Sequence, residues 1–162
     1  CNSKEGNGRM KAMIKFRFVG TAYNGYQVQP GSIPTVQRAL NEATRALFGY
    51  DCDVMGCSRT DAGVHARAFC AAVSKKGQYD LPTTIAAANI PRALCNYLPG
   101  DIAVTDACFV PDDFHPRHCN TKKTYEYRIY MGKYENPIGR QYASCGHYLS
   151  HRRRSFPNPP SC

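Results

Sequence analysis

The residues best suited to chemistry lie in one short segment, Cys57 to Arg67, whose sequence is CSRTDAGVHAR. Asp61 stands two residues after Arg59 and two residues before Gly63, and most of the other side chains are small. Glycine adopts sharply turned conformations at little steric cost, and short side chains leave room for a ligand. We therefore expect an exposed loop that presents Asp61 to solvent.

A guanidinium close to a carboxylate favours its ionised form, so Arg59 would keep Asp61 negatively charged near neutral pH. An ionised aspartate in an open loop can act as a nucleophile or as a base. The simpler interpretation is that Arg59 and Asp61 form an ion pair that only holds the loop, as is frequent for this spacing. The residues alone leave both interpretations open.

Cysteine and histidine side chains offer a second kind of site, in which they would bind zinc. Zinc ligands often come in close Cys-x-x-Cys pairs, and this spacing does not occur in the sequence. Isolated cysteines are also common as small apolar residues of a core. The residues that could serve as ligands are Cys52, Cys57, His115, His118 and Cys119. We predict no metal site from them.

A cysteine nucleophile is a third alternative, in which His65 would activate Cys57 or Cys70. Nothing in the sequence orients such a pair, and free cysteines are usually inert. A histidine without an evident partner is more often a structural hydrogen-bonding residue than a catalyst. We therefore set this alternative aside.

The charge of the chain indicates a polyanionic partner. Its 162 residues include 21 Lys and Arg against 12 Asp and Glu, which gives a net charge of +9. Basic residues attract phosphates, and each contact releases a counterion and so strengthens binding. Basic side chains are interleaved with tyrosines, which favours nucleic acid over a merely solvated surface. These residues are Arg67, Arg117, Lys122, Lys123, Arg128, Tyr125, Tyr127 and Tyr130.

The cysteines and the first residues indicate the compartment. The nine cysteines are odd in number and have no repeated spacing, which argues against a disulfide framework. Residues 1–15 are polar and charged, without the apolar run of a secretory signal. No apolar stretch approaches the length of a membrane span. We expect an intracellular protein with reduced thiols, in the cytoplasm or, as alternatives, in the nucleus or an organelle.

Hydrophobic periodicity predicts the secondary structure. Strands are expected over 12–19, 51–57, 68–73, 102–109 and 123–131. A helix is expected after Thr35, a good N-cap residue, with apolar residues at intervals of three and four until Gly49. A second helical segment is expected over 81–98, kinked or divided at Pro91.

This order of elements predicts an α+β domain of ferredoxin-like or RRM-like type, with an antiparallel sheet and its helices on one face. The other face would be free, and basic and aromatic side chains on it would suit RNA. We expect a flexible arm over 1–11, the α+β domain over 12–140, and an irregular, basic and proline-rich tail over 141–162.

The segment around Asp61 resembles the active-site motif of the tRNA pseudouridine synthase A family, in which GRTDAGVHA is the usual wording. Four further segments resemble motifs of that family and keep their order along the chain. Together the matching segments are 20–29, 56–66, 96–102, 110–117 and 123–128. The resemblance spans about Ile14 to Ile138 and is specific, because five ordered matches do not arise by chance.

The resemblance implies an RNA-modifying isomerase that converts uridine to pseudouridine in the anticodon arm of tRNA, without a metal or a cofactor. It implies that Asp61 is the catalytic nucleophile, whose attack breaks the glycosidic bond before the uracil turns and is rejoined through carbon. Arg59 would push the target nucleotide out of the stack and fill its place, and Tyr125 would stack on the uracil. We assign further substrate or RNA contacts to Thr60, His65, Lys122 and Lys123.

The chain also departs from the family pattern. Tyr26 stands where the family usually has tryptophan, which is a mild aromatic exchange. Family members carry a second half of similar fold, which supplies a basic partner for the aspartate, and nothing resembling it follows about Arg140. The family acts on tRNA as homodimers, which we expect here too. A single half could instead be a non-catalytic RNA-binding protein, and the sequence leaves this alternative open.

Overall fold

The computed structural model describes residues 9–119, 122–132, 134 and 136–146. The chain divides into two units, residues 1–122 and 123–162. Each unit has its own sheet, and each is described by itself. The first unit contains the segment around Asp61, so its architecture decides how that segment is positioned.

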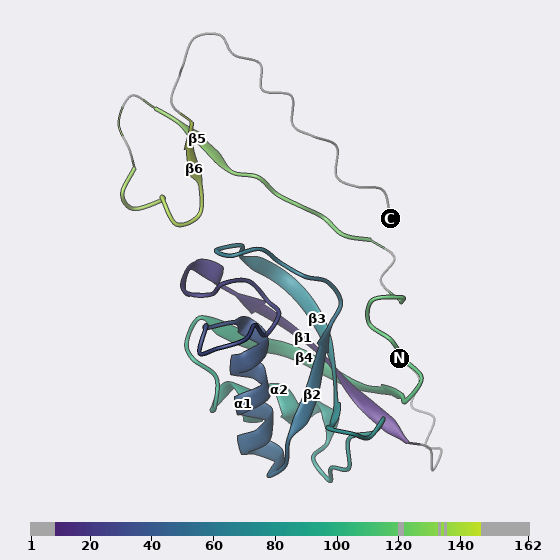
Figure 1. The fold of residues 1–162 in the computed structure, drawn as a ribbon. Helices are drawn as coiled ribbons and strands as arrows, with labels where there is room; N and C mark the ends of the chain where they lie inside the picture. Colours follow the sequence, from purple (N-terminus) through teal and green to yellow (C-terminus); the bar gives the residue numbers. More distant parts are fainter. Residues whose placement is uncertain (1–8, 120–121, 133, 135, 147–162) are drawn as a thin grey trace. The chain divides into compact units, whose positions relative to one another are not determined.

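The first unit is built on a four-stranded antiparallel sheet (Figure 1). Its strands are β1 (Met10–Phe18), β2 (Cys52–Gly56), β3 (Ala66–Lys75) and β4 (Ile102–Pro111), and they lie in the order β2-β3-β1-β4. Every pairing within this sheet is antiparallel. The central strand β1 pairs on both sides, so that Ile14 lies opposite residues of both β3 and β4. The predicted α+β class is confirmed.

Helix α1 (Val36–Phe48) begins and ends at the residues that the sequence predicts. The Thr35 hydroxyl accepts a hydrogen bond from the Arg38 backbone N–H at 3.3 Å, as an N-cap side chain should. Gly49 ends the helix with a φ of 77°, in the left-handed region that glycine tolerates. Local capping chemistry therefore fixes both ends of this helix.

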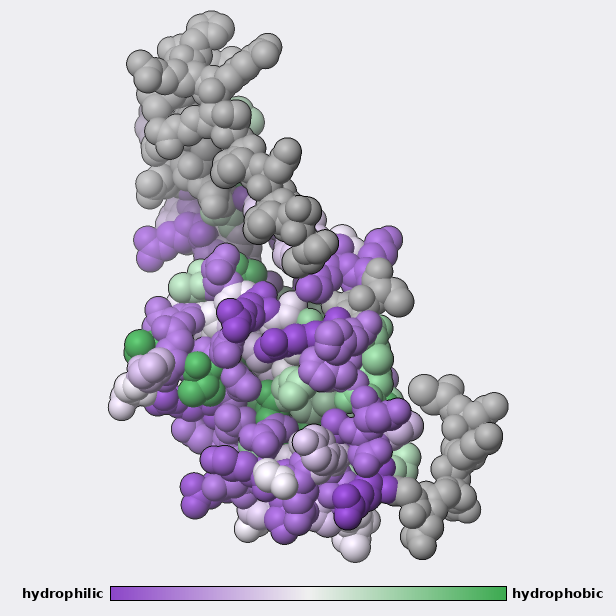
Figure 2. Space-filling model, turned by 45° about the vertical axis from the view of Figure 1, so that its right-hand side comes forward, coloured by the Kyte–Doolittle hydropathy of each residue, from purple (hydrophilic) through white to green (hydrophobic). Residues whose placement is uncertain are grey.

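One face of the sheet is buried beneath the helices α1 and α2 (Ile90–Cys95). Alternate residues of β1, such as Ile14 and Phe16, are fully buried there together with Leu40 of α1 and Leu94 of α2. This alternation is the period of a half-buried strand. Figure 2 shows one face of the molecule, on which hydrophilic residues dominate and hydrophobic residues form only small patches.

The opposite face of β1 carries basic side chains. Lys15 and Arg17 are exposed there, and Lys11 is half-buried with its amine donating to the Phe114 carbonyl at 3.3 Å. These residues alternate with the buried ones along β1, so they lie on the face away from the helical core. The strand thus combines a core face and a cationic face.

The helical prediction over 81–98 is wrong at its beginning. A 3-10 turn, η2 (Ala87–Asn89), is followed by α2, which begins at Ile90. Pro91 lies in the first turn of α2, where its missing N–H breaks no hydrogen bond. Of the two expectations for Pro91, the segment is divided, into η2 and α2, and is not kinked. Proline therefore marks the start of this helix.

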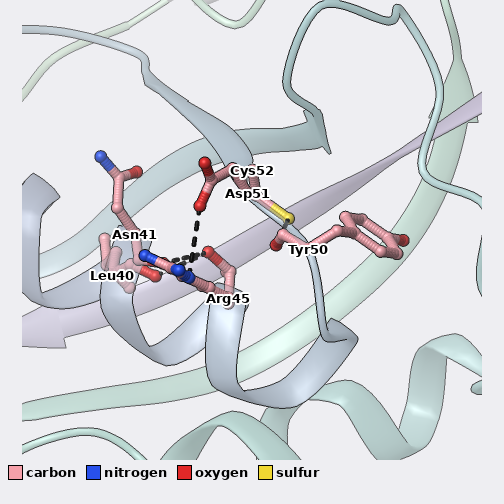
Figure 3. Close-up of polar contacts among 7 residues, drawn as sticks. Leu40, Asn41, Arg45, Tyr50, Asp51 and Cys52 are labelled. Carbon is pink, nitrogen blue, oxygen red and sulfur yellow. Dashed lines mark hydrogen bonds and ion pairs between the residues drawn. The ribbon is translucent and has the colours of Figure 1, made fainter.

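The connection from α1 to β2 shows how a short turn is held by side chains (Figure 3). The Arg45 guanidinium in the last turn of α1 lies 3.4 Å from the Asp51 carboxylate, just before β2. Tyr50, the residue before Asp51, donates its hydroxyl to the Pro82 carbonyl at 2.7 Å. The Arg45–Asp51 pair is exposed, so it contributes well under about 1 kcal/mol to stability, and the capped helix end sets the turn.

The second unit contains β5 (Ile129–Met131) and β6 (Ser144–Gly146), which pair in parallel. The strand expected over 123–131 is therefore wrong for residues 123–128, and β6 lies in a region that was expected to be irregular. Alternation alone did not suffice, because a strand also needs a neighbour for its backbone N–H and C=O groups. Residues 147–162 of the expected tail lie outside the described residues.

No helix within the described ranges is long and apolar enough to cross a membrane.

Because Cys52 is buried under α1, the free energy of unfolding should depend on pH in the alkaline range. Burial is the main cause that raises the pKa of the Cys52 thiol from 9.0 to about 11. Between these pH values the unfolded chain loses a proton that the folded chain keeps, so the free energy of unfolding should fall as pH rises from 9 to 11. A Cys52→Ala variant should show a shallower decline in urea unfolding measured across this range. Cys119→Ala, which removes an exposed thiol, is the control, and curves of equal slope in all three proteins would contradict the assignment.

Candidate active site

The segment around Asp61 is the loop that joins β2 to β3, since β2 ends at Gly56 and β3 begins at Ala66. Asp61 is exposed, as the sequence predicts, and so is Arg59. The sheet therefore delivers a carboxylate to the protein surface on a short loop between two neighbouring strands. Such a position is open to a large ligand.

Arg59 and Asp61 do not form the ion pair that the simpler interpretation proposes. Both residues are described, and no ion pair joins them, in contrast to Arg45 with Asp51 and Arg128 with Glu126. An exposed pair gains little over hydration by water, because it must also fix two side chains. The Asp61 carboxylate is thus left to solvent.

The backbone on either side of Asp61 is held by an earlier loop of the chain. The Gly63 N–H donates to the Tyr23 carbonyl at 3.1 Å, and the Tyr26 N–H donates to the Thr60 carbonyl at 3.3 Å. One bond lies one residue before Asp61 and the other two residues after it. The Asp61 side chain is exposed, but the backbone that carries it is hydrogen-bonded on both sides.

This contact between two loops requires glycine at two positions. A Cβ added at Gly20, the first residue of the 3-10 turn η1 (Gly20–Ala22), would lie 2.0 Å from the Val64 carbonyl oxygen. A Cβ added at Gly25 would lie 2.4 Å from the Thr60 carbonyl oxygen, and its φ of +88° is also unfavourable for other residues. The two loops approach closely enough to hydrogen-bond only because neither position carries a side chain.

Tyr26 supports the loop from below. The Tyr26 ring is buried and stacks on Phe69 at a centroid distance of 4.7 Å. The Tyr26 hydroxyl donates a hydrogen bond to the Val54 carbonyl at 3.3 Å. A Cβ at Gly56 would meet the Tyr26 ring at 2.4 Å, so the end of β2 lies directly on the aromatic ring. Burial raises the pKa of Tyr26 far above its usual value, so this hydroxyl stays protonated and keeps donating.

His65 is part of the same framework. Its Nδ1 accepts a hydrogen bond from the Gly20 backbone N–H at 3.0 Å, which assigns the proton of the neutral ring to Nε2. The Nδ1 atom already accepts this bond, so it is not free to take a proton from Cys57 or Cys70. Burial raises the pKa of the Cys70 thiol and disfavours its nucleophilic thiolate form, which further weakens the cysteine alternative.

The other predicted contact residues are placed as follows. The Thr60 hydroxyl is buried and has no hydrogen-bond partner in the described part of the chain. Lys122 is the last residue of the first unit, whereas Lys123 and Tyr125 belong to the second unit, and all three are exposed. Their approach to Asp61 stays a prediction.

The residues considered as zinc ligands are not gathered. Across the described ranges, no group of three or more His, Cys, Asp or Glu side chains could hold a metal ion. Cys52 is buried in the core beneath α1, while His115 and His118 form a ring pair with centroids 4.3 Å apart. The structure therefore gives the zinc alternative no support.

Residues 20–26 form the framework of the site, which hydrophobic periodicity does not predict. These residues lie in one of the segments that match family motifs, but periodicity contains no sign of their contact with a segment forty residues away. The available signal was the pair of glycines at 20 and 25, spaced among the aromatics Tyr23 and Tyr26. Glycines in such a loop commonly mark a close backbone approach.

Comparison with known proteins gives the following relatives. The chain is 40% identical over 136 residues to a protein named tRNA pseudouridine synthase A from Latilactobacillus sakei subsp. sakei (strain 23K), covering 83% of this chain and 51% of that protein. Proteins of the same name are 42% identical over 121 residues in Citrifermentans bemidjiense, covering 75% and 46%, and 35% identical over 134 residues in Limosilactobacillus reuteri (strain DSM 20016), covering 81% and 50%. The chain spans about half the length of these curated relatives. No protein-family model matches it.

The close approach at Gly25 can be tested against a matched glycine. Gly31 has a similar φ of +82° but nothing within 4 Å of an added Cβ, so Gly31→Ala adds only backbone strain, of about 1–2 kcal/mol. Gly25→Ala adds the same strain and a clash with Thr60, and we expect it to destabilise the protein by at least about 1 kcal/mol more. Urea unfolding of both variants measures the difference. Equal destabilisation would mean that the two loops are not in contact at this position.

Proposed function

We propose that this chain, which is homologous to proteins named tRNA pseudouridine synthase A, carries the nucleophile of such an enzyme. The similarity covers about half the length of these relatives. The reaction would convert a uridine of tRNA to pseudouridine. The observation that carries the proposal is the exposed Asp61 carboxylate on a loop whose backbone is bonded on both sides. Positioned groups accelerate reactions because their placement is settled before the substrate arrives.

The proposed role of Asp61 is nucleophilic. A carboxylate oxygen forms a bond to the ribose C1′ as the bond from C1′ to the uracil N1 breaks, with its electron pair leaving on the uracil. The uracil turns, and C5 forms the new bond to C1′ as the bond from C1′ to the carboxylate oxygen breaks. The C5 hydrogen is then released to water as a proton while N1 gains a proton. Atoms and charge balance with no oxidant or cofactor, and the carboxylate is regenerated. The exposed position of Asp61 and the absence of an ion pair with Arg59 support this role.

The substrate would reach Asp61 as a flipped-out nucleotide. A base stacked in an RNA helix lies beyond the reach of a side chain on a protein loop, so it must leave the stack at a cost of a few kcal/mol. Arg59 is exposed two residues from Asp61 and could occupy the space that the base vacates. Tyr125 would offer its ring as a stacking surface for the uracil. The net charge of +9 supports binding to tRNA, and we propose its anticodon arm as the target and a homodimer as the assembly.

A non-catalytic RNA-binding protein is the second candidate. It is favoured by the observation that the chain spans about half the length of its relatives. The basic residues Lys11, Lys15 and Arg17 on the face of β1 away from the helices are consistent with either candidate. Only turnover distinguishes the two.

Asp61→Asn removes the charge of the carboxylate and nearly preserves its shape. With a tRNA transcript labelled with tritium at C5 of uridine, we expect tritium release to fall by a factor on the order of 10³ or more, because the nucleophile is lost. Asp53→Asn, which changes an exposed aspartate of β2, is the matched control and should release tritium normally. Release at the unaltered rate by Asp61→Asn would contradict the proposed mechanism.

Replacement of Lys122 and Lys123 by alanine tests the RNA contact. Each lost phosphate contact should lower the slope of log affinity against log salt concentration by about 1, since one counterion fewer is released. Filter binding of tRNA from low to high salt measures this slope in both proteins. Unchanged affinity and slope in the double variant would remove these residues from the RNA contact. Salt-dependent binding of tRNA without any tritium release would favour the second candidate.

A further inference from the structure

We infer that the hydrogen bond from Tyr23 to Asp101 positions the catalytic loop, so that Tyr23 and Asp101 are positioning residues for Asp61. The Tyr23 ring is 9% exposed, and its hydroxyl donates to the Asp101 Oδ1 at 2.6 Å. Such a short bond to a carboxylate is about twice as strong as one between neutral groups. This inference rests on the proposed function, because it assigns Tyr23 a part in placing the nucleophile.

Asp101 is the fixed end of this connection. It directly precedes β4, and its backbone carbonyl accepts a hydrogen bond from the Val19 N–H at 2.9 Å, where β1 ends. β1 and β4 are paired along their length in the centre and at the edge of the sheet. The Asp101 carboxylate therefore projects from backbone that the sheet holds in place.

The Asp61 loop is the other end. The Tyr23 carbonyl accepts from the Gly63 N–H at 3.1 Å, two residues beyond Asp61. One residue thus joins the sheet through its side chain and the catalytic loop through its backbone. A shift of Tyr23 would move the point on which the second half of the catalytic loop rests.

The loop that contains Tyr23 has little regular structure of its own. The 3-10 turn η1 has three residues and no side-chain cap, and the Tyr23 N–H closes this turn by donating to the Gly20 carbonyl at 2.9 Å. Its conformation must therefore be fixed by contacts with neighbours, and the hydroxyl bond to Asp101 links it to the start of β4, 78 residues further along the chain. His65, through its bond to the Gly20 N–H, secures the beginning of the same loop.

The hydrogen bond from Tyr23 to Asp101 should persist at any pH at which an enzyme of this kind would work. Burial, followed by the hydrogen bond to Asp101, raises the pKa of the Tyr23 hydroxyl well above its ordinary value. Tyr23 therefore remains a donor across the neutral and moderately alkaline range. Its role is geometric, because its O–H is directed at the Asp101 carboxylate.

Tyr23→Phe removes the hydroxyl and keeps the ring. We expect the single-turnover rate of tritium release at saturating tRNA to fall by about tenfold with the tRNA Kd unchanged, since small displacements of a reacting group cost rate more than binding. Asp101→Asn keeps an oxygen acceptor at the same place and should retain most of the rate of the unaltered chain. Asp101→Ala removes the acceptor and should lower the rate as much as Tyr23→Phe does. Combining Tyr23→Phe with Asp101→Ala should add nothing further, because both changes remove one interaction.

Tyr50→Phe is the matched control. It removes a hydroxyl that donates to the Pro82 carbonyl at 2.7 Å, in the turn between α1 and β2. A general loss of stability would affect both tyrosine variants alike, whereas a positioning role predicts a loss of rate only in Tyr23→Phe. Unchanged rate in Tyr23→Phe, or a loss that is equal in Tyr50→Phe, would overturn the inference.

Amide hydrogen exchange at Gly63, measured by NMR on the unaltered chain and on Tyr23→Phe, gives a readout that does not need catalysis. We expect at least tenfold faster exchange at Gly63 in the variant. If the unaltered chain releases no tritium but the Gly63 exchange accelerates as expected, the proposed function fails and the positioning contact stands. If exchange at Gly63 is unchanged, the positioning contact is refuted whatever the activity.

Discussion

The structure around Asp61 depends on a close contact between two loop backbones. Residues 20–26 lie against the loop between β2 and β3, and hydrogen bonds at Thr60 and Gly63 bracket the aspartate. The contact is possible only at short range, which is why glycine is needed at positions 20 and 25. A loop fixed in this way can leave its functional side chain in water and still present it in a defined place.

In this arrangement, the exposure of the Asp61 carboxylate and the accurate placement of its backbone come from different contacts. Exposure leaves the Asp61 carboxylate open to a large ligand. Positional accuracy is then supplied by backbone hydrogen bonds and by the packing of Tyr26 on Phe69 beneath the loop. The paired strands and the core under α1 carry this loop.

Much of the fold could be predicted from local physics. Thr35 and Gly49 mark the ends of α1 because capping is a property of a few neighbouring residues. Alternation located β1 because one of its faces is buried. The exposure of Asp61 followed from the small residues around it. Each of these predictions depends on groups that are close in sequence.

The rest could not be predicted, because it depends on partners that are distant in sequence. Residues 123–128 alternate as a strand should, yet they lack the pairing that makes one. The helical segment expected from residue 81 begins only at η2, so its apolar residues did not locate its start. The bond between Tyr23 and Asp101 joins residues that no pattern in the sequence connects.

The most direct test of this account is the hydrogen exchange of three backbone amides in the unaltered chain. Tyr26 and Gly63 donate hydrogen bonds that bracket Asp61, whereas the Ala62 N–H makes none in the described part of the chain. The account predicts that the amides of Tyr26 and Gly63 exchange at least tenfold more slowly than that of Ala62, because exchange requires a bonded amide to open first. Equally fast exchange at all three amides would show that the loop is not fixed, and would contradict the central claim.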